Sequence, residues 1–197
     1  MTLTRPALAA AGAVLLATFL AGCSAGDGDT TDRNSAGEVV SGGDVGVSKL
    51  QVGDCVTKAA LGESAEASPS ASPEVSEVES LPAVPCTEPH GGEVVLVDAQ
   101  QFADATEMPD QTAMFDQAEA ACIPAIKAYT GFDFDAYLEA AAAGNAPDVD
   151  VRYAPFTLIP TQDSWAAGDR SMVCIAATMD AGFETIEETT GSAKTKD

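Results

Sequence analysis

The chain has 197 residues, of which 31 are Asp or Glu and nine are Lys or Arg, so its formal charge at pH 7 is −22. So acidic a chain repels the phosphates of nucleic acids, which excludes nucleic acid as a partner. It also repels anionic lipid headgroups, so any membrane attachment must be hydrophobic or covalent. The length allows one domain with a modest core, and we expect no cofactor.

The N-terminus has the features of a secretory signal. Arg5 precedes an apolar run from Ala7 to Leu20. This run is shorter than the about 20 residues that span a membrane and suits the core of a signal peptide. It ends in Leu20-Ala21-Gly22-Cys23, which resembles the bacterial lipobox. We therefore expect residues 1–22 to be a lipoprotein signal peptide and Cys23 to carry a diacylglycerol, whose two chains give a stable anchor.

Composition divides the rest of the chain. Residues 23–48 are rich in Gly, Ser, Asp and Thr and lack apolar periodicity, which predicts a flexible tether. A domain is expected over residues 49–187, interrupted at about residues 60–80 by an acidic Pro/Ser insert predicted to be disordered. Residues 188–197 are predicted to be a frayed polar tail.

Within the domain, strands are predicted on both sides of a central helical block. Residues 49–57 predict a short strand interrupted by a Gly-Asp turn, and the β-branched run 93–97 predicts a strand buried on both faces. Two further strands are predicted at 151–159 and 171–179. Because no βαβ alternation is present, we expect an α+β fold with a small, mostly antiparallel sheet.

The helical block is predicted from apolar residues at helical spacing. This series consists of Phe115, Ala118, Cys122, Ile126 and Tyr129. Pro109 suits the first turn of this helix, whereas Pro124 is expected to kink or end it. A second helix is predicted over residues 136–143, capped by Asp133 or Asp135.

Five cysteines are present, and assigning Cys23 to the lipid leaves an even number. Four cysteines in an exported chain predict a disulfide framework with three connectivities. We favour Cys55–Cys86, which would join the strands beside the insert, and Cys122–Cys174, which would join the helix to a strand. A metal site is not expected, because the chain has one histidine and no CxxC spacing.

Three motifs resemble those of the actinobacterial septum-formation domain family. They are Val52-Gly53-Asp54-Cys55, Val84-Pro85-Cys86-Thr87-Glu88-Pro89-His90-Gly91-Gly92-Glu93-Val94, and Trp165-Ala166-Ala167-Gly168-Asp169-Arg170 leading to Cys174. The resemblance covers residues 49–180 and implies a link to cell division, without a catalytic residue or ligand to carry over. Two departures are the acidic insert and Gly91, which stands where the family usually has Asp.

The same motifs contain a candidate binding patch, formed by His90, Glu93, Trp165, Asp169 and Arg170. His90 beside Glu93 could act as a metal ligand or general base, and Trp and Arg dominate binding hot spots. The structural alternatives are a turn histidine bonded to backbone and a core tryptophan.

For Asp169 and Arg170 the structural alternative is also specific. Gly168 and Asp169 would form a turn between two strands, and Arg170 would pair with an acid such as Asp54. This alternative predicts that the residues of the third motif hold the fold and do not contact a partner.

Together these features predict a non-enzymatic binding or scaffolding module, lipid-anchored at the extracytoplasmic face of the cell membrane. Its partner would be an envelope or division protein, linked to septum formation. The alternatives are an envelope hydrolase acting on peptidoglycan or peptide, and a solute-binding lipoprotein. Convergence of His90, Glu93 and Arg170 in an open cleft would favour the hydrolase, whereas a large apolar pocket with convergent polar groups would favour solute binding.

Overall fold

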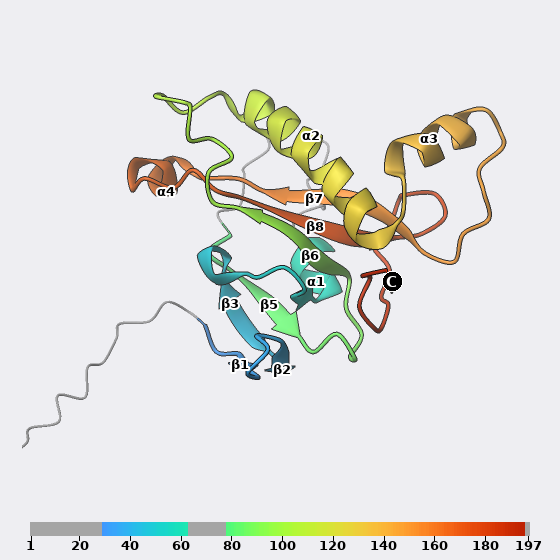
Figure 1. Cartoon of the computed structure of the whole chain (residues 1–197), viewed down its shortest axis with the longest axis horizontal. Helices are drawn as coiled ribbons and strands as arrows, with labels where there is room; N and C mark the ends of the chain where they lie inside the picture. Colours follow the sequence, from blue (N-terminus) through green and yellow to red (C-terminus); the bar gives the residue numbers. More distant parts are fainter. Residues whose placement is uncertain (1–28, 63–77, 196–197) are drawn as a thin grey trace, which may run out of the picture.

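The computed structural model describes residues 29–62 and 78–195, so the expected signal peptide, Cys23 and most of the acidic insert lie outside the described residues. Within these ranges the fold is α+β, as predicted (Figure 1). Its main sheet has six strands in the order β3-β5-β4-β6-β8-β7, and every neighbouring pair is antiparallel. No described helix combines the length and hydropathy needed to cross a membrane.

The strands of the main sheet are β3 (Gly43–Gly46), β4 (Cys55–Val56), β5 (Ser80–Val84), β6 (Gly92–Asp98), β7 (Arg152–Leu158) and β8 (Met172–Met179). A separate antiparallel hairpin consists of β1 (Asp32–Arg33) and β2 (Val39–Ser41). The helices are α1 (Lys58–Gly62), α2 (Gln111–Thr130), α3 (Phe134–Ala142) and α4 (Gln162–Ala166), with a 3₁₀ turn at Val47–Lys49. The three longest strands and α2 and α3 lie where the sequence predicts them.

The prediction of a flexible tether is wrong for residues 29–48. This segment forms β1, β2, β3 and the 3₁₀ turn, and Val39 and Val45 bury their side chains in the core. The predicted strand at 49–57 is also shorter than expected, since only Cys55 and Val56 pair with neighbours. The segment folds because a few β-branched residues reach the core, although its average composition is polar.

Helix α2 has the expected start but not the expected break. Asp110 caps it by accepting a hydrogen bond from the N–H of Ala113 at 3.0 Å, and Gly131 ends it with a φ of +76°. Pro124 lies inside the continuous helix, which corrects the predicted kink or end. Pro124 and Ala120 are solvent-exposed, so water can reach the carbonyl that lacks a helical donor.

The buried stripe of α2 is shifted by one residue from the predicted series at its start. Met114, Ala118, Cys122 and Ile126 are buried, whereas Phe115 is 37% exposed. Strand β6 is likewise buried on both faces only over its first half, because Val97 is exposed. The helix packs across β6, β7 and β8 on one face of the sheet (Figure 1).

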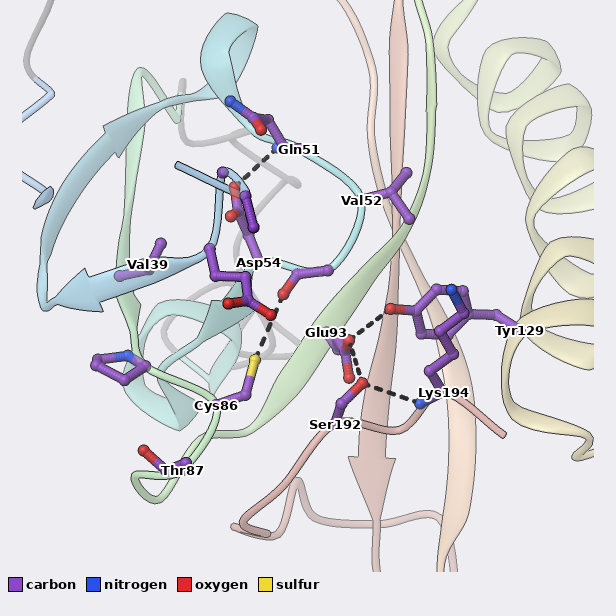
Figure 2. Close-up of a pocket in the computed structure, with 15 residues that line it drawn as sticks. Val39, Gln51, Val52, Asp54, Cys86, Thr87, Glu93, Tyr129, Ser192 and Lys194 are labelled. Carbon is purple, nitrogen blue, oxygen red and sulfur yellow. Dashed lines mark hydrogen bonds between the residues drawn. The ribbon is translucent and has the colours of Figure 1, made fainter. Parts of the chain in front are cut away.

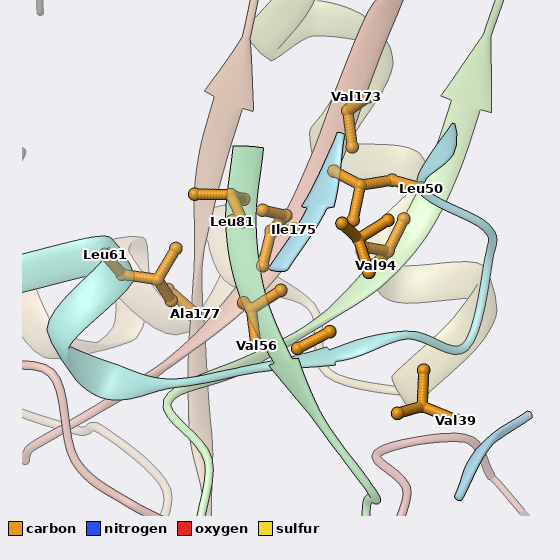
Figure 3. Close-up of a cluster of buried hydrophobic side chains, with 11 residues drawn as sticks. Val39, Leu50, Val56, Leu61, Leu81, Val94, Val173, Ile175 and Ala177 are labelled. Atoms are coloured by element: carbon orange, nitrogen blue, oxygen red, sulfur yellow. The ribbon is translucent and has the colours of Figure 1, made fainter. Parts of the chain in front are cut away.

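Two hydrophobic clusters lie on the two faces of the sheet, and β8 contributes to both because its side chains alternate. Val173, Ile175 and Ala177 belong to the cluster that also contains Val56 and Val94 (Figure 3). The alternate residues Met172, Cys174 and Ala176 pack with α2. The predicted disulfides are both present: Cys122–Cys174 joins α2 to β8, and Cys55–Cys86 joins β4 to the turn after β5.

Gly91 lies where two segments meet. A Cβ atom at this position would be 2.5 Å from Cα of Lys58 and 3.1 Å from Cγ2 of Ile186. The Asp that is usual in the resembled family therefore cannot be accommodated here unless α1 moves. In this chain, the close approach of α1 to the sheet requires glycine.

Candidate functional site

A surface pocket of about 410 Å³ lies between the small hairpin and the end of the main sheet. Figure 2 shows its walls, formed by residues 36–39, the turn 51–54, the turn 85–87 and the C-terminal segment. Glu93 of β6 and Tyr129 of α2 also line it, with Ser192 and Lys194 from the C-terminal segment. The pocket thus collects residues from both ends of the described chain.

The hairpin wall is fixed by a buried ion pair. Arg33 donates from Nη1 and Nη2 to the two carboxylate oxygens of Asp54, at 2.5 and 2.8 Å. Nη1 also donates to the carbonyl of Gly37 at 2.8 Å, and the N–H of Gln51 donates to Asp54 at 2.8 Å. Asp54 is only 3% exposed. Its ion-pair partner is therefore Arg33, which corrects the suggested pairing with Arg170.

The Cys55–Cys86 disulfide forms a second wall. Cys86 lines the pocket, and its Sγ lies 3.4 Å from the carbonyl oxygen of Gly53. A carboxylate oxygen of Glu93 lies within 4.8 Å of both sulfurs. The sulfurs are bonded to each other and offer no thiolate, so this group holds a covalent bridge beside a carboxylate and is no metal-ligand set.

Glu93 is a buried acceptor, with 1% of its surface exposed. The hydroxyls of Tyr129 and Ser192 donate to Oε1 at 2.6 and 2.8 Å, and the N–H of Ala193 donates to Oε2 at 2.5 Å. Hydrogen bonds to a carboxylate are stronger than those between neutral groups. Glu93 therefore holds the C-terminal segment against the end of the sheet.

We call residues 188–195 the C-terminal strap, and the prediction that they are frayed is wrong. Thr189 exchanges two backbone hydrogen bonds with His90, at 3.0 and 2.9 Å. The N–H of Gly191 donates to the carbonyl of Cys86 at 2.6 Å, and that of Thr195 to the carbonyl of Tyr129 at 2.9 Å. The strap is ordered despite its polar composition, because acceptors in the rest of the domain accept hydrogen bonds from its backbone N–H groups.

The predicted patch does not form one surface. His90 is buried with Nδ1 2.9 Å from the carbonyl oxygen of Glu88, as in the turn-histidine alternative. Arg170 lies over the ring of Trp165, at 3.5 Å from its centroid, and donates to the Trp165 carbonyl at 2.9 Å. Asp169 accepts hydrogen bonds from its neighbour Ser171. All five residues have structural partners.

Glu93 and Arg170 are held apart because they lie near opposite ends of β6. Glu93 pairs with Ala176 near the start of β6, whereas Asp98 at its end pairs with Met172, close to Arg170. Five residues of strand separate these positions by about 17 Å. Of the predicted patch only Glu93 lines the pocket, and the convergence of His90, Glu93 and Arg170 that would favour a hydrolase is not observed.

Arg33, Ser192 and Lys194 are site residues that were not predicted from the sequence. Arg33 carried a usable signal: it is the only Arg or Lys between Arg5 and Lys49, and Val39-Val40 follow it after a turn-forming Asn-Ser-Ala-Gly stretch. Ser192 and Lys194 carried none, because Ser192 acts by donating to Glu93, 99 residues earlier, and Nζ of Lys194 lies 5.9 Å from the ring centroid of Tyr129 on α2.

The tyrosines near Glu93 give an alkaline pH dependence. Burial, and then the hydrogen bond to Glu93, raise the pKa of Tyr129 above its ordinary value of 10.0, and burial raises the pKa of Tyr153. Both side chains therefore keep their protons to higher pH in the folded than in the unfolded chain. Stability should be unaffected by them below pH 10 and should fall as the pH rises above it.

Unfolding curves between pH 8 and 12, with tyrosinate absorbance recorded at 295 nm, test this dependence. The loss of stability above about pH 10 should be shallower in Tyr129→Phe, because one titrating group is removed. An identical pH slope in the variant would contradict the assignment to Tyr129.

Comparison of the chain with protein-family models, curated proteins and solved structures finds no match. Evidence on function therefore comes from the pocket and from the sequence. The resemblance to the septum-formation family remains an expectation based on its three motifs.

Proposed function

We propose that the protein is a lipid-anchored, non-enzymatic binding module at the extracytoplasmic face of the cell membrane, with an envelope or division protein as its partner. The observation that carries this proposal is the pocket, whose walls are held by a disulfide and a buried ion pair. Walls that are already fixed lose little conformational entropy when a partner binds. The two disulfides also favour an oxidising compartment.

The chemistry of the pocket favours binding over catalysis. Three donors converge on Glu93, so its carboxylate oxygens are already used as hydrogen-bond acceptors within the domain. The hydroxyl of Ser192 donates to this carboxylate. The single histidine of the chain, His90, is hydrogen-bonded through Nδ1 to the carbonyl of Glu88, and no described hydrogen bond joins it to Ser192. A nucleophile activated by an oriented base is not assembled from these residues.

A lipid on Cys23 would hold the pocket close to the membrane. Six residue steps separate Cys23 from Asp29, where the described chain begins, and they span about 20 Å at full extension. The hairpin that follows is itself a wall of the pocket. The anchor would thus be shorter than a tether over residues 23–48, and a membrane or envelope partner would be within reach.

Anchoring is tested by fractionating cells that express wild type or Cys23→Ala. The wild type should be found with membranes and carry lipid, and the variant should lose acylation and leave the membrane fraction. A Cys23→Ala protein that still carries lipid and sediments with membranes would contradict the anchor.

Two exposed valines offer a matched test of the pocket. Val52 is 51% exposed and lines the pocket, whereas Val40 is 54% exposed and is not among the lining residues. After crosslinking in intact envelopes, Val52→Gln should capture at least about tenfold less of the partner than wild type, and Val40→Gln should capture the same amount. A tenfold loss corresponds to about 1.4 kcal/mol of binding free energy.

The outcome that contradicts the proposal is equal capture by wild type and both variants, which would place the binding surface elsewhere. Equal melting temperatures for the two valine variants serve as the control for folding, because exposed substitutions change stability little.

A further inference from the structure

The C-terminal strap is held against the domain through alternate backbone N–H groups. Its alternate N–H groups, those of Thr189, Gly191, Ala193 and Thr195, donate in turn to the His90 carbonyl, the Cys86 carbonyl, Oε2 of Glu93 and the Tyr129 carbonyl. The distances are 2.9, 2.6, 2.5 and 2.9 Å. A spacing of two residues resembles that of an extended strand, but the strap is not a regular strand: it bends at Gly191, whose φ of +87° is one that glycine adopts readily.

The acceptors are supplied by the body of the domain. Cys86 and His90 lie in the loop between β5 and β6, Glu93 lies on β6, and Tyr129 lies near the end of α2. Together these four residues form what we call the acceptor groove. Because the groove is complete before residue 131, a separate chain in the same conformation as the strap would meet the same acceptors.

The strap fills the acceptor groove but leaves the adjoining pocket open. Ser192 and Lys194, two positions apart, both line the pocket. About 410 Å³ remains with the strap in place. Larger side chains at these two positions would bury more surface than Ser192 and Lys194 do.

We propose that the acceptor groove is a receptor for a peptide segment of a partner protein that adopts the conformation of the strap, and that the strap is an internal ligand which the partner displaces. The inference rests on the proposed function, since it names the kind of partner that the pocket takes. The segment needs free N–H groups at alternate positions, glycine at the position of Gly191, and a small residue opposite Glu93, where the strap has Ala193. Larger residues at the positions of Ser192 and Lys194 would enter the pocket.

Charge favours a neutral or basic segment. The pocket is lined by two acidic residues, Glu38 and Glu93, and by Lys194 of the strap. Asp54 also lines it, but this residue is paired with Arg33. When the strap leaves, Lys194 leaves with it, and the two glutamates remain. A peptide that brings its own ammonium or guanidinium group would restore this balance.

The experiment uses the full mature chain and a fluorescent peptide with the sequence of residues 188–197. A tethered strap competes at an effective concentration of order millimolar, so the peptide should bind wild type poorly. Ala193→Pro in the protein removes the N–H that donates to Glu93 and weakens the strap. This variant should bind the peptide at least about tenfold more tightly than wild type in a polarisation titration.

Two modified peptides identify the binding mode. N-methylation at Ala193 removes one of the four donors and should weaken binding to the Ala193→Pro protein about tenfold or more. N-methylation at Thr190, whose N–H is not one of the four, should leave the affinity within about twofold. Equal affinities for the two modified peptides would overturn the inference.

A folded Ala193→Pro protein that binds no peptide would also overturn it. If this variant does not fold, hydrogen exchange in the wild type decides, because the four donor amides should be protected and rapid exchange at all four excludes the groove. If the peptide does not bind while Val52→Gln still loses its partner, the acceptor groove is rejected and the proposed function stands.

Discussion

The double variant Cys122→Ala/Cys174→Ala is expected to lose roughly 3–5 kcal/mol of unfolding free energy. The bridge closes a loop with a sequence separation of 52 residues, for which chain entropy alone gives about 4 kcal/mol. Both sulfurs are fully buried between α2 and β8, so their removal also leaves unfilled space in the core. The loss should appear in guanidinium unfolding monitored by circular dichroism.

The second disulfide provides the matched control. Cys55–Cys86 has a sequence separation of 31, so its chain-entropy contribution is nearly as large, at about 3.7 kcal/mol. It joins a strand to a turn at the pocket and does not attach a helix to the sheet. We therefore expect Cys55→Ala/Cys86→Ala to be the less destabilised pair, and a larger loss than in the core pair would contradict the clamping role of Cys122–Cys174.

A single variant gives a different readout. In Cys174→Ser the remaining thiol of Cys122 lies on the buried stripe of α2. Thiol labelling should therefore be slow in native buffer and rapid after unfolding. Fast labelling would show that α2 detaches from the sheet once the bridge is removed.

The fold could be predicted from the sequence where side chains report directly on local structure. The strand predicted at 171–179 is β8, and the helical spacing of Ala118, Cys122 and Ile126 identified the buried face of α2 correctly. The prediction that Pro124 would kink or end the helix is wrong because it considered only the local effect of proline. Tertiary contacts hold α2 on both sides of Pro124. Cys122 is bridged to β8, and Ile126 is fully buried one turn later.

The site was less predictable, because its residues act across long sequence distances. Glu93 was singled out, but its donors Ser192 and Ala193 lie in a polar segment without periodicity. Arg33 similarly lies in a stretch whose composition predicts a tether. The composition of a segment reports its average polarity. The ordering of the hairpin and of the strap depends instead on single hydrogen bonds and on one buried ion pair, which the average does not show.

Arg33→Met is expected to lower the free energy of unfolding by about 3 kcal/mol. The substitution leaves the buried carboxylate of Asp54 with the N–H of Gln51 as its remaining donor among those described. Removing one partner of a buried ion pair typically costs 3–5 kcal/mol. We expect the low end of this range because Arg33 retains 16% exposure, which lets water approach.

Two further variants separate the charge effect from a general loss of contacts. Adding Asp54→Asn to Arg33→Met removes the unpaired charge and should recover part of the stability. Lys127→Met breaks the exposed pair with Asp133, which has an N–O distance of 2.5 Å, and should leave the free energy of unfolding unchanged within error.

Because Arg33 also donates to the carbonyl of Gly37, its loss should release the hairpin wall and weaken partner capture along with stability. Urea unfolding of the four proteins decides: an Arg33→Met chain as stable as wild type would show that the hairpin is not held by this pair.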